Sequence, residues 1–329
     1  MSEVRVYMVN PTVISLFAGC GGSSLGYQSA GFRELLAVEW DDNAVEILKL
    51  NFHGLPIFHG DIATLTIEQC LLLAGIKVGE LDVLDGSPPC QGFSIAGKRR
   101  FKDERNSLFE EFVRLLKALQ PRVFVMENVP GMIKGCMKQL TVKMFNELRS
   151  CGYRVKGQVI NAMYYGVPQS RQRVIMIGVR EDLGVDPSHP KPQAKPITAF
   201  EATCDLPRDD STTLKALGHG IWKLTAPGRH FSRLHPKGHW FNACKVDPNK
   251  PAPTITKTVF EMGAAGLYHW EYPRALNIAE LKRLASFPDE FQMAGSFQDQ
   301  WARIGNSVPP MLMKAIAGHI KERILKNVR

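Results

Sequence analysis

Cys90 and Glu127 are the side chains of this 329-residue sequence that best suit covalent chemistry. Cys90 lies in the polar, proline-rich segment 86–94 (GSPPCQGFS), and the Lys and Arg residues that follow it would favour its thiolate. Glu127 lies near the end of the apolar run 122–128 (RVFVMEN). Taken singly, the cysteine could be a small core residue and the glutamate a solvated strand end. Taken together, they predict a nucleophile and a carboxyl group that face one pocket.

A glycine-rich turn supplies a second candidate site. Residues 17–22 read FAGCGG and connect an apolar run to a helical pattern that begins near Ser23. Glycines at such a turn let the backbone approach a nucleotide-like cofactor closely, although a tight turn alone would also explain them. Glu39 ends the next apolar run, where a carboxylate can accept hydrogen bonds from ribose hydroxyls, and Asp61 ends the third. This spacing fits both NAD and S-adenosylmethionine.

Two further motifs contribute polar groups. The segment 169–173 (QSRQR) opens an apolar run, and an extended backbone would place Arg171 and Arg173 on the same side of the chain. Residues 303–310 (RIGNSVPP) predict a Gly-Asn turn in front of a C-terminal helix. Purely structural roles, surface charge for the arginines and a cap for the helix, would also account for these motifs.

Strands alternating with helices must position these residues. Short apolar runs predict strands at 12–17, 34–40, 56–59, 81–86, 122–128, 153–160 and 173–180, and helical patterns include 42–51, 107–119 and 137–151. This alternation predicts an α/β fold with a doubly wound, mostly parallel sheet. Consecutive parallel strands joined by a crossover helix are usually neighbours. The strand ends near Cys90 and Glu127 should therefore lie side by side.

The periodic pattern fades from 181 to 272, where Pro, Gly, His and aromatic residues accumulate. Helical spacing returns at 277–287 and 308–325. We therefore expect a catalytic domain built from residues 1–180 and 273–329, with a smaller, loop-rich domain, residues 181–272, inserted between the two parts.

The net charge is +9, and a strongly basic stretch with a net charge of +7 lies inside the predicted insertion. Between residues 211 and 260 the sequence has eight Lys or Arg and one acid, with Trp, Phe and His interleaved. This mixture predicts contacts with nucleic-acid phosphates and bases, and a solvated basic face is the alternative. The spacing of His235, His239 and Cys244 resembles a zinc site, but a convincing fourth ligand is missing, so we expect no metal.

The composition excludes several classes of protein. Hydrophobic residues make up 44% and charged residues 22% of the chain, as in a globular protein with a sizeable core. No apolar stretch is long enough to cross a bilayer, and the N-terminus lacks the pattern of a secretory signal. The seven cysteines are scattered without a Cys-x-x-Cys pair. They indicate a reducing compartment, and we expect a cytoplasmic protein.

Six motifs, taken in chain order, resemble those of the DNA (cytosine-5) methyltransferase family. They are FAGxGG at 17–22, PPCQxFS at 88–94, ENV at 127–129, QxRxR at 169–173, a region like RxLxxxExxxxxxFP at 274–288 and GNSVPP at 305–310. The resemblance covers nearly the whole chain except the variable segment from about 181 to 272. It implies a Rossmann-like class I methyltransferase fold with S-adenosylmethionine as cofactor. Two departures are Ser15, where many members have Asp, and residues 277–279, where Thr-x-Arg is usual.

The resemblance also implies roles for individual residues. The thiolate of Cys90 would add to C6 of cytosine, so that C5 can accept the methyl group. Glu127 would hold N3 in a protonated form, and Arg173 would donate to O2, with Arg171 of the same motif as a further catalytic candidate. The implied cofactor contacts are Phe17, Ala18, Gly19, Gly21, Gly22, Glu39, Trp40, Asp61, Ile62, Pro89, Asn306 and Ser307.

The basic segment falls where this family has its target-recognition domain. The target cytosine would be flipped out of double-stranded DNA, and the loop 96–106 would close on the DNA. Phosphate contacts would dock the enzyme while a few side chains read base edges. The candidate DNA-binding residues are Arg99, Arg229, Arg233 and Lys237.

The resemblance implies a monomeric modification enzyme of a restriction-modification system, and a cognate restriction endonuclease acting on the same site is a candidate partner. Methylation of tRNA is the nearest alternative within the family. A nicotinamide-dependent oxidoreductase would share the glycine turn and Glu39 but would leave Cys90 and Glu127 without roles. A non-catalytic DNA-binding protein would keep the basic segment but would need no cysteine beside a strand that carries a carboxyl group.

Overall fold

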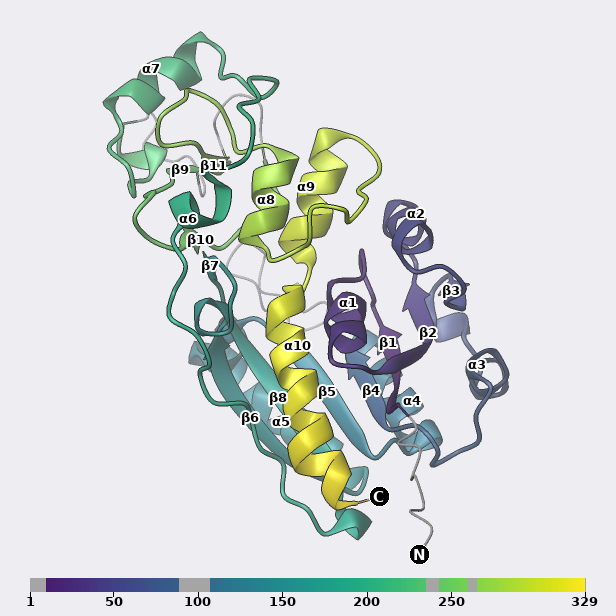
Figure 1. The fold of residues 1–329 in the computed structure, drawn as a ribbon. Helices are drawn as coiled ribbons and strands as arrows, with labels where there is room; N and C mark the ends of the chain where they lie inside the picture. The colour runs from purple at the N-terminus through teal and green to yellow at the C-terminus, as the bar shows by residue number, and fades with distance from the viewer. Residues whose placement is uncertain (1–9, 89–106, 235–242, 260–264, 329) are drawn as a thin grey trace, which may run out of the picture.

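Seven strands form the central sheet, in the order β3-β2-β1-β4-β5-β8-β6 (Figure 1). The computed structural model describes residues 10–88, 107–234, 243–259 and 265–328. Strands β3, β2, β1, β4 and β5 are parallel, and β8 runs antiparallel to both β5 and β6. The predicted α/β fold with a mostly parallel sheet is confirmed, and each predicted strand is present. The bounds are β1 Thr12–Leu16, β2 Arg33–Glu39, β3 Ile57–His59, β4 Val83–Gly86, β5 Val123–Asn128, β6 Tyr153–Asn161 and β8 Gln172–Arg180.

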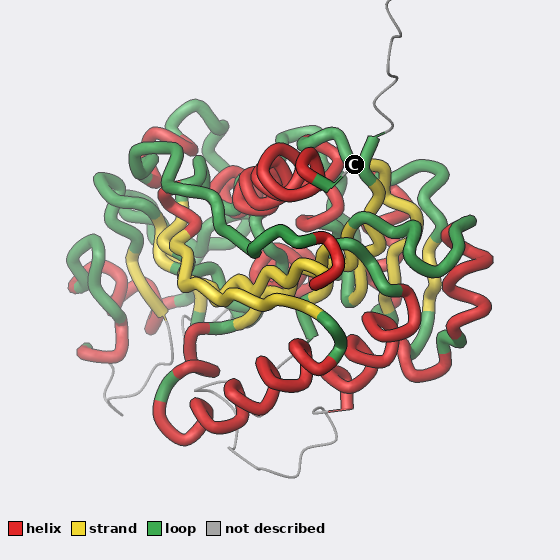
Figure 2. Tube along the Cα trace, turned by 90° about the horizontal axis from the view of Figure 1, so that it is seen from below, coloured by secondary structure: helices red, strands yellow, loops and turns green. Residues whose placement is uncertain are grey.

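Helices cover both faces of this sheet, as the view along the layers shows (Figure 2). On one face α1 and α10 bury apolar side chains against β1, β4 and β5. On the other face α3, α4 and α5 pack against the same three strands. The sheet is therefore doubly wound, as predicted. The bounds are α1 Gly22–Ser29, α3 Ile67–Ala74, α4 Ser107–Leu119, α5 Lys138–Ser150 and α10 Pro310–His319, with α2 Asp42–Asn51 near the sheet edge that ends in β3.

A smaller lobe is built from short elements. Strand β9 pairs with β11, and β10 pairs with β7, which directly precedes the central strand β8. Helices α8 and α9 lie between this lobe and the central sheet (Figure 1). The bounds are β7 Gln169–Ser170, β9 Ala243–Lys245, β10 Ala252–Pro253, β11 Gly266–Tyr268, α6 Ala199–Thr203, α7 Ala216–Leu224, α8 Ile278–Leu284 and α9 Phe297–Asn306.

One hydrophobic cluster joins the two lobes. It contains Ile47 and Leu48 of α2, Phe231 and Tyr268 of the smaller lobe, and Trp301 of α9. Because such a cluster removes apolar surface of both lobes from water at once, it fixes one lobe against the other. Helices α8 and α9 follow the predicted domain boundary at residue 273 in the sequence, yet their apolar faces contact both lobes.

The predicted Gly-Asn turn at 305–306 is wrong, because these residues form the last turn of α9. The helix begins with a capping box in which Ser296 and Asp299 exchange hydrogen bonds. Residue 305 is a glycine although it lies inside the helix, because a Cβ there would be 2.5 Å from the carbonyl oxygen of Thr256. The glycine thus permits a close approach between α9 and the smaller lobe. Helices α3, α6, α7 and α9 are not among the helical patterns named from the sequence.

Candidate active site

The glycine turn lies between β1 and α1 and requires glycine at two positions. Gly21 has a φ of 90°, a conformation that other residues rarely adopt. A Cβ at Gly21 would lie 2.4 Å from the Phe52 ring, and a Cβ at Gly22 would lie 2.3 Å from the carbonyl oxygen of Val308. The turn therefore fits closely between the residue after α2 and the segment before α10.

Glu39, at the end of β2, holds the glycine turn in place. Its Oε2 accepts a hydrogen bond from the backbone N–H of Gly19 at 2.7 Å, and its Oε1 accepts from the N–H groups of Trp40 and Asp41, both at 2.9 Å. Oε2 keeps a second lone pair with which it can accept a ribose hydroxyl. The adjacent Trp40 side chain is 75% exposed and offers a flat apolar surface on which an aromatic ring could stack.

Asp61 lies next to Glu39 because β3 pairs with β2. The N–H of Gly60 donates to the carbonyl oxygen of Glu39 at 3.0 Å, and Asp61 follows directly. Its exposed carboxylate accepts from the N–H of Ala63 at 3.0 Å and so caps a short helix. Ile62 is buried in the hydrophobic core, so its side chain supports the turn from the core side.

The end of α9 meets the glycine turn from the C-terminal part of the chain. Ser307 Oγ lies 2.9 Å from Cys20 Sγ, and Arg303 Nη2 lies 3.1 Å from Asp41 Oδ2. Burial raises the pKa of Cys20 to about 11, so this thiol stays protonated and has a packing role. Asn306, the last residue of α9, is exposed. The structure thus brings Ser307 next to the glycine turn, where it must lie if both are to contact the same ligand.

Sequence reasoning missed Arg303 and Asp41. Asp41 also caps α2 by accepting a hydrogen bond from the N–H of Ala44 at 3.0 Å. An acid directly before the helical pattern at 42–51 is a cap signal that could have singled out Asp41. Nothing in the sequence connects it with Arg303, whose position depends on how α9 packs.

The predicted carboxyl group and one predicted arginine meet at the carboxyl end of β5. Arg173 Nε lies 2.6 Å from Glu127 Oε1. The contact spans the antiparallel strands β5 and β8, where Ile175 is directly opposite Glu127 and Arg173 is the diagonal neighbour. A buried carboxylate is thereby held in one orientation by a fixed cation.

The strand that leads to Cys90 lies beside the strand that carries Glu127, as predicted. Strands β4 and β5 pair in parallel, with Gly86 opposite Met126. The described chain continues from β4 to Pro88, and Pro89 and Cys90 lie outside the described residues. The structure therefore places the two strand ends together and leaves the Cys90 thiol itself a prediction.

Arg171 does not share a partner with Arg173. Its side chain is 2% exposed, and its Nη1 donates to the carbonyl oxygens of Ile255 at 3.1 Å and Gly305 at 3.0 Å. Burial, and then the positive charge of Arg173, lower the pKa of Arg171, whereas Glu127 raises it. The two arginines of the motif thus have different surroundings, one against backbone carbonyls and one against a carboxylate.

Of the four predicted DNA-binding residues, the structure describes Arg229 and Arg233, which both lie in the smaller lobe. Arg229 is exposed, and its backbone pairs with Lys245, the last residue of β9. Arg233 ends a short helix that begins at Phe231, and Arg99 and Lys237 lie outside the described residues. Lys245 is unavailable for DNA, because its Nζ lies 3.7 Å from the centre of the Trp222 ring and is buried there.

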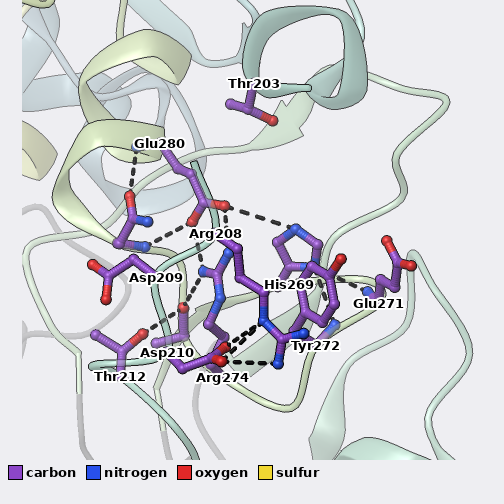
Figure 3. Close-up of polar contacts among 12 residues, drawn as sticks. Thr203, Arg208, Asp209, Asp210, Thr212, His269, Glu271, Tyr272, Arg274 and Glu280 are labelled. Carbon is purple, nitrogen blue, oxygen red and sulfur yellow. Dashed lines mark hydrogen bonds and ion pairs between the residues drawn. The ribbon is translucent and has the colours of Figure 1, made fainter. Parts of the chain in front are cut away.

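A buried ion pair stabilises the smaller lobe (Figure 3). Arg274 makes two hydrogen bonds to Glu280, at 2.7 and 2.8 Å. Glu280 Oε2 also accepts from the N–H of Asn277, and Asn277 Oδ1 accepts from the N–H of Glu280, so that the two residues cap α8. Asn277, which departs from the family pattern, is therefore the N-cap residue of α8.

His269 completes this cluster as a neutral side chain. Its Nδ1 accepts hydrogen bonds from the N–H groups of Glu271 and Tyr272 at 3.0 and 3.1 Å, which places the ring proton on Nε2. Nε2 lies 3.7 Å from Glu280 Oε1 (Figure 3). Burial, and then the charge of Arg274, lower the pKa of His269 to about 3. The sequence motif at 274–288 gave no indication of this histidine.

The described residues contain no group of three or more His, Cys, Asp or Glu that could hold a metal ion. Of the three residues with metal-like spacing, His235 and His239 are not described, and Cys244 is buried with its pKa raised to about 11 by burial. Within the same described part of the chain, no helix has the length and apolar character needed to cross a membrane.

Fold and site together define the class of protein. The sheet order, with one antiparallel strand next to its edge, the glycine turn after β1 and the acid after β2 are those of class I methyltransferases, which use S-adenosylmethionine. More narrowly, the chain belongs to the family of C-5 cytosine-specific DNA methylases, whose model matches residues 11–322.

Curated relatives are type II methyltransferases. The chain is 35% identical to M1.HphI of Haemophilus parahaemolyticus, over 99% of this chain and 90% of the relative. It is 33% identical to M.NgoFVII of Neisseria gonorrhoeae, over 94% and 86%. These relatives and the family model confirm the predicted activity: the protein transfers a methyl group from S-adenosylmethionine to C5 of cytosine in DNA.

Solved structures agree with this fold. A putative DNA modification methyltransferase encoded within an E. coli prophage superimposes with a TM-score of 0.79 at 26% identity, over 97% of this chain and 99% of the other. A DNMT2 variant of Spodoptera frugiperda gives a TM-score of 0.68 at 19% identity, over 97% and 99%, and shows the shared fold alone. Because the likeness to DNMT2 is one of fold alone, it gives little support to the alternative that this protein methylates tRNA.

The residues around the glycine turn fit S-adenosylmethionine. Glu39 has a free lone pair for a hydroxyl group, Trp40 presents an exposed ring, and the turn leaves no space for side chains at Gly21 or Gly22. These groups suit a nucleoside joined to an amino acid, with the backbone close to the ligand. The predicted cofactor is thus confirmed by the family and compatible with the donor groups in the structure.

Proposed function

We propose that methyl transfer takes place at the carboxyl ends of β4 and β5, on a cytosine flipped out of duplex DNA. The observation that supports this most directly is the ion pair between Glu127 and Arg173. It puts an acid and a cation at the edge where open α/β sheets bind their ligands. When bound, S-adenosylmethionine supplies an electrophilic methyl group.

Cys90 is the proposed nucleophile. Its thiolate forms a bond to C6 of the cytosine, and the electron pair of the C5–C6 double bond then becomes available at C5 for a bond to the methyl carbon. The bond between this carbon and the sulfur of the cofactor would break in the same transfer, with S-adenosylhomocysteine as the leaving group. Glu127 holds a proton at N3, and Arg173 donates to O2, so that the charge that develops on the ring is stabilised. Loss of the C5 proton restores the double bond and expels Cys90 as a thiolate.

We propose that the cofactor lies along the glycine turn between β1 and α1. Backbone groups of the turn hold its amino-acid part, Glu39 its ribose, and Trp40 its adenine, because these groups match the polarity of each part. The full set of proposed contacts is Phe17, Ala18, Gly19, Gly21, Gly22, Glu39, Trp40, Asp61, Ile62, Pro89, Asn306 and Ser307.

The smaller lobe is the proposed reader of the DNA sequence. Most of the net positive charge of the chain lies between residues 211 and 260, and Arg229 in this segment is exposed. Phosphate contacts by basic side chains would dock the duplex against the lobe. Arg99, Arg229, Arg233 and Lys237 are the proposed contacts, and residues 181–272 the proposed domain.

The type II relatives suggest a biological setting. We propose a monomer that modifies the DNA of a bacterial cytoplasm within a restriction-modification system, with a restriction endonuclease of the same site as its companion. The catalytic domain would comprise residues 1–180 and 273–329.

Transfer of tritium from labelled S-adenosylmethionine tests the proposed chemistry. Duplex DNA should take up label, whereas tRNA at the same concentration should not. Cys90→Ser should abolish both transfer and covalent trapping on DNA that contains 5-fluorocytosine, because the trapped species requires the sulfur–C6 bond. Label in tRNA alone, or trapping by the Cys90→Ser protein, would overturn the proposal.

A further inference from the structure

The side chain of Arg171 sits where three parts of the chain meet. Next to it, Gln169 and Ser170 pair with Ala252 and Pro253 of the smaller lobe. Arg171 follows these paired residues directly in the sequence and is 2% exposed. Nη1 donates both to Ile255, which follows β10, and to Gly305 in the last turn of α9. One group therefore holds the smaller lobe and α9 against the segment that enters β8.

Further contacts reinforce this junction around Arg171. Ile255 N–H donates to Gln169 Oε1 at 3.2 Å, and Thr254 Oγ1 donates to the carbonyl oxygen of Ser170 at 2.9 Å. On the other side, Trp301 Nε1 of α9 donates to the carbonyl oxygen of Thr256 at 2.8 Å. The segment 254–256 is thus fixed between the chain before β8 and α9, and Arg171 bonds both to Ile255 of this segment and to Gly305 of α9.

Each group that Arg171 holds leads to a part of the proposed active site. Two residues after Gly305, Ser307 contacts Cys20 in the glycine turn. Two residues after Arg171 itself, Arg173 pairs with Glu127. Ile255 belongs to the lobe that carries the basic segment. The cofactor end, the catalytic pair and the DNA-reading lobe are therefore all reached within two residues of Arg171 or of its acceptors.

A buried charge at such a position needs a reason. Arginine keeps its charge when buried and has a rigid fork of donors, whereas burial of an ion that contacts only backbone carbonyls carries a large desolvation cost. Two carbonyls from distant segments could be joined at lower cost by a neutral donor. The charge of Arg171, close to Arg173 and Glu127, makes a long-range electrostatic contribution to the same pair.

We propose that Arg171 is a positioning residue for methyl transfer, which fixes the DNA-reading lobe and the end of α9 relative to Arg173 and Glu127. It acts through these groups and does not touch the base. The inference rests on the proposed placement of the reaction at Glu127 and Arg173. Because a misplacement of about 1 Å can cost about 100-fold in rate, the loss of this guanidinium should appear in kcat.

The test compares Arg171→Met, Arg171→Lys and the control Arg180→Met. Arg180 is a matched control because it also donates to a backbone carbonyl, that of Gln120, at the opposite end of β8. Rates are measured with tritiated S-adenosylmethionine and duplex DNA at saturating concentrations. They are divided by the number of folded sites, counted by binding of S-adenosylhomocysteine, so that a loss of folded protein does not count as a loss of rate.

Arg171→Met should lower kcat per folded site about 100-fold and leave KM for both substrates within about threefold. Arg171→Lys should recover at least about tenfold of this loss, because an ammonium group can donate to both carbonyls. Arg180→Met should keep the wild-type kcat. If Arg171→Met does not fold, the kcat of Arg171→Lys per folded site is compared with that of wild type. A loss of no more than about tenfold supports the inference, and a loss of about 100-fold overturns it.

A wild-type kcat per folded site for Arg171→Met would overturn the inference, since Arg171 would then be structural only. A Lys variant that folds, binds S-adenosylhomocysteine and is as inactive as the Met variant would also overturn it, because a guanidinium in contact with the base would then be required. A wild-type enzyme that transfers no label to DNA would instead refute the proposed function, which keeps the two failures apart.

Discussion

Arg173 Nε and Glu127 Oε1 lie 2.6 Å apart across the antiparallel strands β8 and β5, and the two side chains are 12% and 11% exposed. Neither charge has enough contact with bulk water to be solvated alone, so each depends on the other. In the proposed reaction both groups turn to the cytosine ring, Glu127 to N3 and Arg173 to O2. The ion pair therefore holds two catalytic side chains in place before the substrate arrives.

Glu127→Gln tests this arrangement with little change in volume. The amide can still accept a hydrogen bond from Arg173 but cannot hold an acidic proton at N3, so the rate of methyl transfer should fall about 10²-fold to 10³-fold. Single-turnover transfer of tritium measures this rate. The affinity for S-adenosylhomocysteine, measured by calorimetry, should stay unchanged. Glu110→Gln, at an exposed position of α4, is the control, and equal rates for the two variants would contradict the assignment.

The fold and the pairing of the two strand ends could be predicted from the sequence because they depend on local pattern. Alternating apolar runs and helical patterns gave the seven central strands within about two residues, and the neighbourhood of β4 and β5 follows from the rule for crossover connections. Gly21 and Glu39 could be found for the same reason, since a turn after β1 and an acid after β2 are local signals.

The contacts that could not be predicted join residues that are far apart in the sequence. Arg171 and Arg173 look equivalent in the motif, but Arg171 bonds to carbonyls 84 and 134 residues away, and these positions are set by tertiary packing. The sequence predicts a turn at Gly305 because glycine usually follows the end of a helix, whereas in the structure this glycine lets α9 approach Thr256. In both cases the residue type is compatible with several structural roles, and a contact with a residue far away in the sequence determines which role it has.

The ion pair between Arg303 and Asp41 should couple α9 to cofactor binding. Asp41 follows Glu39 and Trp40, and its side chain and that of Arg303 are 30% and 19% exposed. Arg303→Met and Asp41→Asn should each weaken the binding of S-adenosylhomocysteine about threefold to tenfold, while Asn keeps the cap of α2. Calorimetry on the single and double variants should give a coupling free energy of about 0.5–1 kcal/mol. Strictly additive losses would show that the two side chains affect the cofactor independently, so that the contact between them does not couple α9 to cofactor binding.

Glu280→Gln should destabilise the protein by about 3–5 kcal/mol, because it leaves the charge of Arg274 buried without its partner. The amide oxygen can still accept from the N–H of Asn277, so the cap of α8 is kept. Urea unfolding followed by circular dichroism measures the free energy. Glu271→Gln, at an exposed position nearby, should lie within about 0.5 kcal/mol of wild type. A Glu280→Gln protein with the stability of this control would contradict the prediction.

Asp85 on β4 should make stability depend on pH. It is 2% exposed and accepts a hydrogen bond from the Tyr27 hydroxyl at 3.4 Å. The pKa of Asp85 is raised to about 8, chiefly by burial; hydrogen bonds from Ser23 and Tyr27 limit the rise, and the nearby charges of Glu34 and Glu127 add to it. Burial likewise raises the pKa of Glu34 to about 7. An unfolded aspartate loses its proton near pH 4, so between about pH 4 and pH 8 the folded chain binds more protons than the unfolded chain.

The free energy of unfolding should therefore fall as pH rises through this window, by up to about 1.4 kcal/mol per pH unit for one such group. Asp85→Asn removes this group, so its stability curve should be flatter than that of wild type. The comparison is best made between pH 6.5 and pH 8, because His269, with a pKa lowered to about 3, acts in the opposite direction below pH 6.5. Urea unfolding at each pH gives the two slopes. Asp42→Asn, whose carboxylate is 96% exposed, should run parallel to wild type. If the Asp85→Asn curve ran parallel as well, the folded protein would already hold Asp85 as a carboxylate.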